Sequence, residues 1–163
     1  MNEPRLLGSV DRSAATVTLQ RTLPASPGEV WAALTDPIRL ATWLGPLTDG
    51  APGPDQSFIL QMSGDESASC RVITWQPEHE LRLVWHYTGE GPSEVTFRLD
   101  GDGDGTRLTL VHTKLAVDPV QYGAGWHVHL DQLLAHLTGV PPHADFMAVY
   151  RALEPRYAAV AVP

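Results

Sequence analysis

The sequence has little of what disulfide-bonded, membrane-spanning and nucleic-acid-binding proteins require. Among 163 residues there is one cysteine, Cys70, so no disulfide can form within the chain. No apolar run approaches the roughly 20 residues that a membrane-spanning helix needs. The 11 lysines and arginines are scattered among 19 acidic residues, and the net charge of -8 opposes binding to a phosphate backbone. Residues 1–5 lack the layout of a signal peptide, so we expect a cytoplasmic protein without a membrane span.

The composition is that of a globular protein with a substantial core. Hydrophobic residues make up 43% of the chain and charged residues 18%. The length favours a single domain over residues 1–163. Cys70 lies in an alternating pattern, where a small buried hydrophobe is its usual role.

The N-terminal part predicts a strand followed by two short helices. Residues 16–23 alternate apolar and β-branched polar side chains, which indicates a strand with one buried face. Arg21 interrupts the apolar face, so we expect that end to reach solvent or a partner carboxylate. Residues 26–29, Ser-Pro-Gly-Glu, form a capping box that predicts a helix start. Asp36-Pro37 predicts a second helix, which Gly45-Pro46 ends.

The middle of the chain predicts a loop and then five further strands. Residues 45–56 are rich in glycine, proline and aspartate, which is typical of a loop. Short punctuated connections between the strands indicate antiparallel neighbours. The five segments are residues 58–62, 68–75, 81–87, 95–99 and 106–114.

The C-terminal part predicts a long helix and a less regular final one. Asp118-Pro119 resembles a helix start, and an apolar stripe at helical spacing follows at residues 126–137. Gly139 and the two prolines after it end this helix. Apolar residues over 146–157 suggest another helical segment, which Pro155 is expected to kink or end.

The order strand, two short helices, five strands, long helix resembles the START-like superfamily. Several phrases resemble its bacterial branch named after the activator of the ninety-kilodalton heat-shock protein ATPase. They are Glu-Val-Trp-Ala-Ala-Leu-Thr-Asp-Pro at 29–37, Leu-Ala-Thr-Trp-Leu-Gly-Pro at 40–46, Gly-Thr-Arg-Leu-Thr-Leu-Val-His-Thr at 105–113, and Gly-Trp at 125–126 leading into Leu-Asp-Gln-Leu at 130–133.

The resemblance implies an α+β helix-grip fold, with the core of the domain at about residues 16–139 and a C-terminal extension over 140–163. A curved antiparallel six-stranded sheet wraps around the long C-terminal helix, with two short helices after the first strand and an apolar cavity between sheet and helix. Members of the superfamily bind lipids, hormones and polyketides, and some catalyse cyclisation or dehydration. Fold alone does not choose among these functions.

Inward-facing aromatic residues are the main candidates for a ligand site. Four tryptophans, Trp31, Trp43, Trp85 and Trp126, fall on elements that should face inward. They either line a cavity or fill an ordinary core. With a cavity, Met62, Phe97, Leu110 and Leu130 join the lining.

His112 is the polar residue with the clearest functional possibility. Strand alternation places it beside Leu110, on the face that we expect to be buried. There it can orient a ligand or act as a general base. We favour a satisfied core histidine, or one at the cavity mouth near water. The sequence assigns His112 no carboxylate or hydroxyl partner, which weakens the case for an enzyme.

Two patterns resemble metal sites, and each has a simpler explanation. Residues 100–105, Asp-Gly-Asp-Gly-Asp-Gly, match the first half of a calcium loop, but Val111 occupies the position of the essential glutamate. A hairpin turn accounts for them. His127 with Asp131, and His129 with His136, have helical spacing but no third ligand, so we expect an exposed helix face with an ion pair. We predict no metal and no cofactor.

Three functions remain open on the sequence. The first is noncatalytic binding of a small apolar or amphipathic molecule between the sheet and the long helix. The second is a protein-interaction module, such as a co-chaperone. The third is a cyclase or hydratase that uses the same cavity, with His112 as its weak catalytic candidate. A monomer and a homodimer are both compatible with the sequence.

Overall fold

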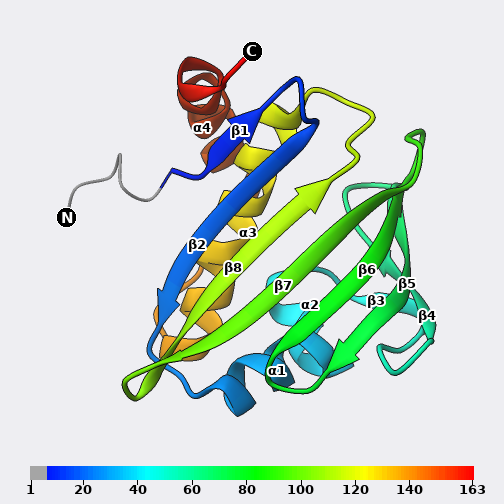
Figure 1. Cartoon of the computed structure of the whole chain (residues 1–163), viewed down its shortest axis with the longest axis vertical. Helices are drawn as coiled ribbons and strands as arrows, with labels where there is room; N and C mark the ends of the chain where they lie inside the picture. Colours follow the sequence, from blue (N-terminus) through cyan, green and yellow to red (C-terminus); the bar gives the residue numbers. More distant parts are fainter. Residues whose placement is uncertain (1–6) are drawn as a thin grey trace.

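One antiparallel sheet carries the fold, and the longest helix runs behind two of its strands (Figure 1). The computed structural model describes residues 7–163, so the expectation about a signal peptide lies outside the described residues. The strand order is β1-β2-β8-β7-β6-β5-β4-β3. The strands are β1 (Ser9–Asp11), β2 (Thr16–Leu23), β3 (Leu47–Gly50), β4 (Ser57–Gln61), β5 (Ser67–Gln76), β6 (Glu80–Tyr87), β7 (Ser93–Asp102) and β8 (Gly105–Thr113). The helices are α1 (Pro27–Thr35), α2 (Pro37–Trp43), α3 (Pro119–Thr138) and α4 (Phe146–Val160).

The described part of the sheet has eight strands, so the prediction of six is wrong. The two additional strands, β1 and β3, are the two edges of the sheet. They have only three and four residues, and every residue of β3 except Leu47 is exposed. Such short edge strands carry no apolar alternation that a sequence pattern can reveal. The assignment of residues 45–56 to a loop therefore missed β3.

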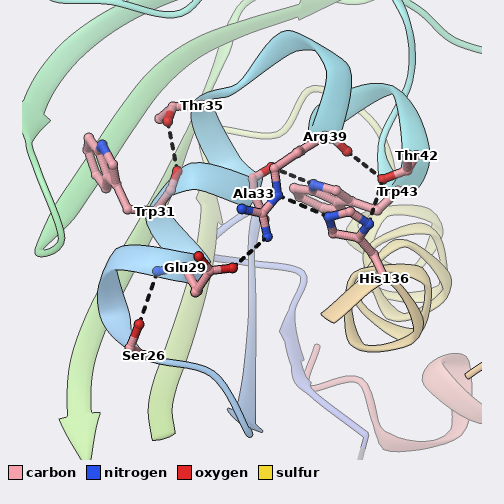
Figure 2. A network of polar contacts seen from close by, with 9 residues as sticks. All are labelled: Ser26, Glu29, Trp31, Ala33, Thr35, Arg39, Thr42, Trp43 and His136. Atoms are coloured by element: carbon pink, nitrogen blue, oxygen red, sulfur yellow. Dashed lines mark hydrogen bonds and ion pairs between the residues drawn. The ribbon is translucent and has the colours of Figure 1, made fainter. Parts of the chain in front are cut away.

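The predicted helix caps are present, but the capping box is only half formed. Ser26 Oγ accepts a hydrogen bond from the Glu29 backbone N–H, and Asp36 Oδ1 accepts one from the Ile38 N–H. The Glu29 side chain instead pairs with Arg39, whose Nη2 lies 3.2 Å from Glu29 Oε2. Figure 2 shows Arg39 between Glu29 and His136. The glutamate thus ties α1 to α2.

A polar cluster joins α2 to the last turn of α3 (Figure 2). Arg39 Nε donates to His136 Nε2 at 3.1 Å, so the proton of the neutral ring is on Nδ1, 3.1 Å from Thr42 Oγ1. Thr42 Oγ1 in turn donates to the Arg39 carbonyl. Burial and the Arg39 charge both lower the pKa of His136, which keeps the imidazole neutral and able to accept.

The core lies where α3 crosses the inner face of the sheet. Asp118 caps α3, and Gly139 ends it with a left-handed φ of 75°, as the sequence predicted. Trp126, Leu130 and Leu133 on its inner face are at most 2% exposed. Cys70 also lies in the core, where burial raises its thiol pKa to about 12.

The C-terminal segment is helical and packs on α3. Helix α4 continues through Pro155 to Val160, so the proline does not end it. The Tyr157 hydroxyl accepts a hydrogen bond from the Gly8 N–H at 3.0 Å and lies 2.8 Å from His127 Nδ1. After the helix, the Val162 N–H donates to the Val10 carbonyl of β1. The end of the chain is therefore fastened to the first strand.

Arg21 does not reach solvent, contrary to the expectation from the sequence. Its side chain is buried at 8% exposure, and its Nη1 donates to the Gln20 carbonyl at 2.8 Å. Burial raises the pKa of Tyr157, and the nearby Arg21 charge opposes part of that rise. Tyr157 of α4 lies near this guanidinium, a long-range contact that strand alternation cannot reveal.

Two glycines of α3 provide a matched test of how α4 packs. A Cβ at Gly123 would lie 2.9 Å from the Tyr157 ring, whereas a Cβ at Gly125 would meet no atom within 4 Å. We predict that Gly123→Ala destabilises the fold by about 1–3 kcal/mol through overpacking. Gly125→Ala should stabilise it by about 0.5–1 kcal/mol through helix propensity. Urea unfolding measures both, and equal effects would contradict the packing.

Candidate functional site

A cavity of about 630 Å³ opens between α3, the ends of β4 and β6, and the first turns of α4. The loop after α2 completes its wall. Such a volume is within the range of pockets that hold small molecules. Its lining residues are Leu44, Gly45, Pro46, Gln61, Met62, Ser63, Glu66, Trp85, Tyr87, Glu90, Gln121, Tyr122, Gly125, Trp126, His129, Phe146, Met147 and Tyr150.

Two tryptophans from facing layers form the inner wall of the cavity. Trp85 projects from β6 and Trp126 from α3, and their ring centroids lie 5.4 Å apart. Met62 and Phe146 add apolar surface from β4's end and from α4. Gly125 leaves open space beside Trp126, because a Cβ there would touch nothing within 4 Å. The cavity therefore has an aromatic interior.

Behind this wall, His112 is fully enclosed and satisfied. Trp126 Nε1 donates to His112 Nδ1 at 3.0 Å, so the proton of the neutral ring is on Nε2, 2.7 Å from Ser93 Oγ. Ser93 Oγ in turn donates to the Trp85 carbonyl. Burial lowers the pKa of His112 to about 3. The imidazole is thus neutral at ordinary pH and uses both nitrogens within the core.

A second chain of hydrogen bonds crosses the mouth of the cavity. Trp85 Nε1 donates to the Tyr122 hydroxyl at 3.2 Å, and that hydroxyl donates to Glu90 Oε1 at 2.6 Å. Burial, and then the bond to Glu90, raise the pKa of Tyr122, so the phenol remains protonated. On the same side, the Tyr87 hydroxyl donates to Glu66 Oε1 at 3.3 Å. These bonds hold the carboxylates of Glu66 and Glu90 at the rim of the cavity.

His129 lines the cavity as a neutral ring. Its Nδ1 lies 3.2 Å from the Trp43 carbonyl, which can only accept, so Nδ1 carries the proton. Burial lowers the pKa of His129 to about 4. The ring packs between Trp126 and Phe146, at centroid distances of 5.7 and 4.8 Å. Its Nε2 is left as an acceptor.

The chain matches a known protein family over most of its length. The family described as "Activator of Hsp90 ATPase homolog 1-like protein" matches residues 24–138, which include α1 to α3 and most of the sheet. This chain belongs to that family. It is accordingly a member of the START-like superfamily with a helix-grip fold, as the sequence phrases indicated. No protein with a curated description matches the chain.

Several solved structures resemble this one. CalU16 of Micromonospora echinospora is 29% identical, with a TM-score of 0.74 over 89% of this chain and 87% of its own. A Bordetella parapertussis protein is 29% identical, with a TM-score of 0.72 over 92% and 88%. DynU16, from the dynemicin biosynthetic locus, is 28% identical, with a TM-score of 0.70 over 77% of this chain and 48% of its own.

The structure separates the candidate lining residues into two groups. Trp85, Trp126 and Met62 line the cavity. Trp31 lies elsewhere: its ring packs edge-on against Trp75 at 5.1 Å, and it projects from α1 away from the Arg39 cluster (Figure 2). The others are buried in the core outside the lining: Trp43, Phe97, Leu110, His112 and Leu130.

The expectation of an exposed histidine face on α3 is wrong. His127 is 7% exposed and lies against Tyr157, and His129 lies against Phe146, because α4 covers this side of the helix. Asp131 accepts a hydrogen bond from His143 Nε2 at 2.9 Å and lies 4.0 Å from His127. Within residues 7–163, no three potential ligands gather where they could hold a metal ion.

The hairpin interpretation of residues 100–105 is confirmed. They join β7 to β8, and Gly103 has a left-handed φ of 62° in the turn. In the described part of the chain, no helix combines the length and the apolar character needed to cross a membrane.

Several lining residues carried no recognised signal in the sequence. Glu66 and Glu90 lie in turns, where acidic residues are common and no periodicity applies. Tyr122 falls in the first turns of α3, ahead of its apolar stripe. The aromatic residues of 146–157 were visible as a helical pattern, but nothing indicated that α4 would turn back onto the cavity.

Trp126 is expected to contribute to stability as well as to the cavity wall. We predict that Trp126→Ala lowers the free energy of unfolding by about 3–5 kcal/mol, because a ring at 2% exposure is lost and His112 Nδ1 loses its donor. Trp126→Phe is the control, since it keeps most of the ring and removes the N–H. A loss below about 1 kcal/mol for Trp126→Ala would refute this packing.

The buried histidines predict a loss of stability in mild acid. His112 and His129 have folded pKa values near 3 and 4, below the unfolded value near 6.5. Well above pH 6.5 both rings are neutral in the folded and unfolded states, so they cause no loss of stability. As the pH falls below 6.5, the unfolded state binds protons that the folded state does not. Each histidine then lowers the free energy of unfolding by up to about 1.4 kcal/mol per pH unit, until its folded pKa is reached. Urea unfolding between pH 7.5 and 5 measures the slope. His112→Asn should reduce it, and an unchanged slope in that variant would refute the account for His112.

Proposed function

We propose that this protein binds a small apolar or amphipathic molecule in the cavity between the sheet and α3, without catalysing a reaction. The observation that carries the proposal is the cavity of about 630 Å³ with the Trp85–Trp126 pair as its inner wall. Aromatic rings bury a large apolar area against a ligand and favour flat or extended partners.

Gly125 supports this proposal because it keeps space open in an otherwise packed helix face. Protein interiors are close-packed, and few voids exceed a water molecule. Glycine inside a helix is unfavourable relative to alanine. An added Cβ at Gly125 would meet nothing within 4 Å, so packing alone does not require glycine there. The helix therefore leaves room beside Trp126 that only a large side chain would fill.

The position of His112 favours binding over catalysis. Both ring nitrogens are engaged, one by Trp126 and one by Ser93, and the side chain is 0% exposed. A general base must lie within reach of the proton that it removes. DynU16 belongs to a biosynthetic locus, and this relative supports a small organic molecule as the ligand class.

The test uses N-phenyl-1-naphthylamine, an uncharged probe whose fluorescence rises in an apolar site. The purified protein should bind one probe per chain, with saturable enhancement. Gly125→Phe should weaken binding at least about 10-fold, because the new ring occupies the cavity. Gly125→Ala is the matched control and should retain binding. Equal affinity in the phenylalanine variant, provided that it remains folded by circular dichroism, would refute the cavity as the site.

A further inference from the structure

The buried side-chain donors around the cavity are all used inside the protein. Trp126 Nε1 donates to His112, and Trp85 Nε1 donates to the Tyr122 hydroxyl. The phenols of Tyr122, Tyr87 and Tyr150 each donate to a glutamate, at 2.6, 3.3 and 3.1 Å. A ligand that enters finds no free indole or phenol proton.

The remaining donors of the lining lie at its edge. The Gln61 amide donates to the Gly64 carbonyl, and Gln121 and Ser63 are exposed to solvent. Among the side chains of the deeper lining, His129 Nε2 is a free acceptor, because the other ring nitrogen donates to the Trp43 carbonyl.

The rim adds two negative charges without a positive one. Glu66 and Glu90 form no ion pair within residues 7–163, and no lysine or arginine is among the described lining residues. Glu90 receives the Tyr122 proton at Oε1, and Oε2 accepts no hydrogen bond in the described part of the chain. This oxygen is available to a ligand.

The two carboxylates lie on neighbouring connections at the cavity mouth, because Ser67 and Thr88 exchange hydrogen bonds where β5 begins and β6 ends. Burial, and then the charges of Glu66 and Glu90, raise the pKa of Tyr87 to about 12. The rings of Tyr87, Tyr122 and Trp85 line the same side. Aromatic faces attract cations, and carboxylates attract them more strongly.

We propose that the cavity selects molecules in which an apolar body carries a protonated amine, with the ammonium held between Glu66 and Glu90. The inference rests on the binding function proposed above and assigns its ligand class. An anionic ligand, such as a fatty acid or a phosphate ester, meets like charge at the mouth of the cavity and no free indole or phenol donor inside it, so we expect it to bind more weakly.

The test compares three ligands that share one apolar body: 2-(1-naphthyl)ethylamine, 2-(1-naphthyl)ethanol and 1-naphthylacetate. Each displaces N-phenyl-1-naphthylamine from the full chain at pH 7 and low ionic strength. The amine should bind about 10-fold more tightly than the alcohol, and the carboxylate more weakly than the alcohol. Added salt should reduce the amine's advantage.

The double variant Glu66→Gln/Glu90→Gln tests the residues. In it, the ratio of amine to alcohol affinity should fall to near one. The matched control is Asp102→Asn/Asp104→Asn, which removes the same charge from the β7–β8 hairpin, at the opposite end of β7 from Glu90. The control should keep the wild-type ratio.

The outcomes separate this inference from the binding function. If the alcohol displaces the probe but the amine binds no more tightly, the charge selection is wrong and the binding site stands. If both double variants change the ratio equally, net charge rather than the rim is responsible, and the assignment to Glu66 and Glu90 fails. If no ligand and no probe binds, the proposed function itself fails.

Discussion

The packing of Trp126 against the sheet is the contact on which the rest of the structure depends. From α3 its ring reaches Trp85 at 5.4 Å and Phe97 at 5.8 Å, so it joins the helix to β6 and β7. Its indole N–H fixes the tautomer of His112, which in turn contacts Ser93. The same ring forms part of the cavity wall. The Trp126 side chain therefore contributes both to stability and to the shape of the cavity. Behind it, on the side away from the cavity, both ring nitrogens of His112 are hydrogen-bonded.

Helix α3 also determines where α4 packs against it and where space remains for the cavity. At Gly123 the missing side chain lets the Tyr157 ring approach, which seats α4 on α3. Two residues later, Gly125 faces open space beside the cavity. Because α4 also supplies Phe146 and Tyr150 to the lining, the segment beyond the matched family region completes the site. The cavity is thus a product of how two helices pack.

The sequence predicted the framework well, because the framework is made of strong periodic signals. The strand at residues 16–23, the caps at Ser26 and Asp36, and the left-handed end of α3 at Gly139 all appear where expected. Edge strand β3 was missed because its residues are mostly exposed. Of the nine candidate site residues, Trp85, Trp126 and Met62 reach the cavity, while the other six, from α1, α2, α3 and the sheet, are buried outside its lining. Alternation shows which face is buried, but it cannot show where α4 leaves space.

The most direct test of the account is to observe the indole N–H signals of the tryptophans by ¹⁵N-resolved NMR during titration with 2-(1-naphthyl)ethanol. Trp85 and Trp126 line the cavity, whereas Trp31 and Trp75 pack against each other outside it. The account predicts that the Trp85 and Trp126 signals shift together and saturate, while those of Trp31 and Trp75 stay in place. Shifts confined to Trp31 and Trp75, or no shift at any tryptophan at saturating ligand, would contradict it.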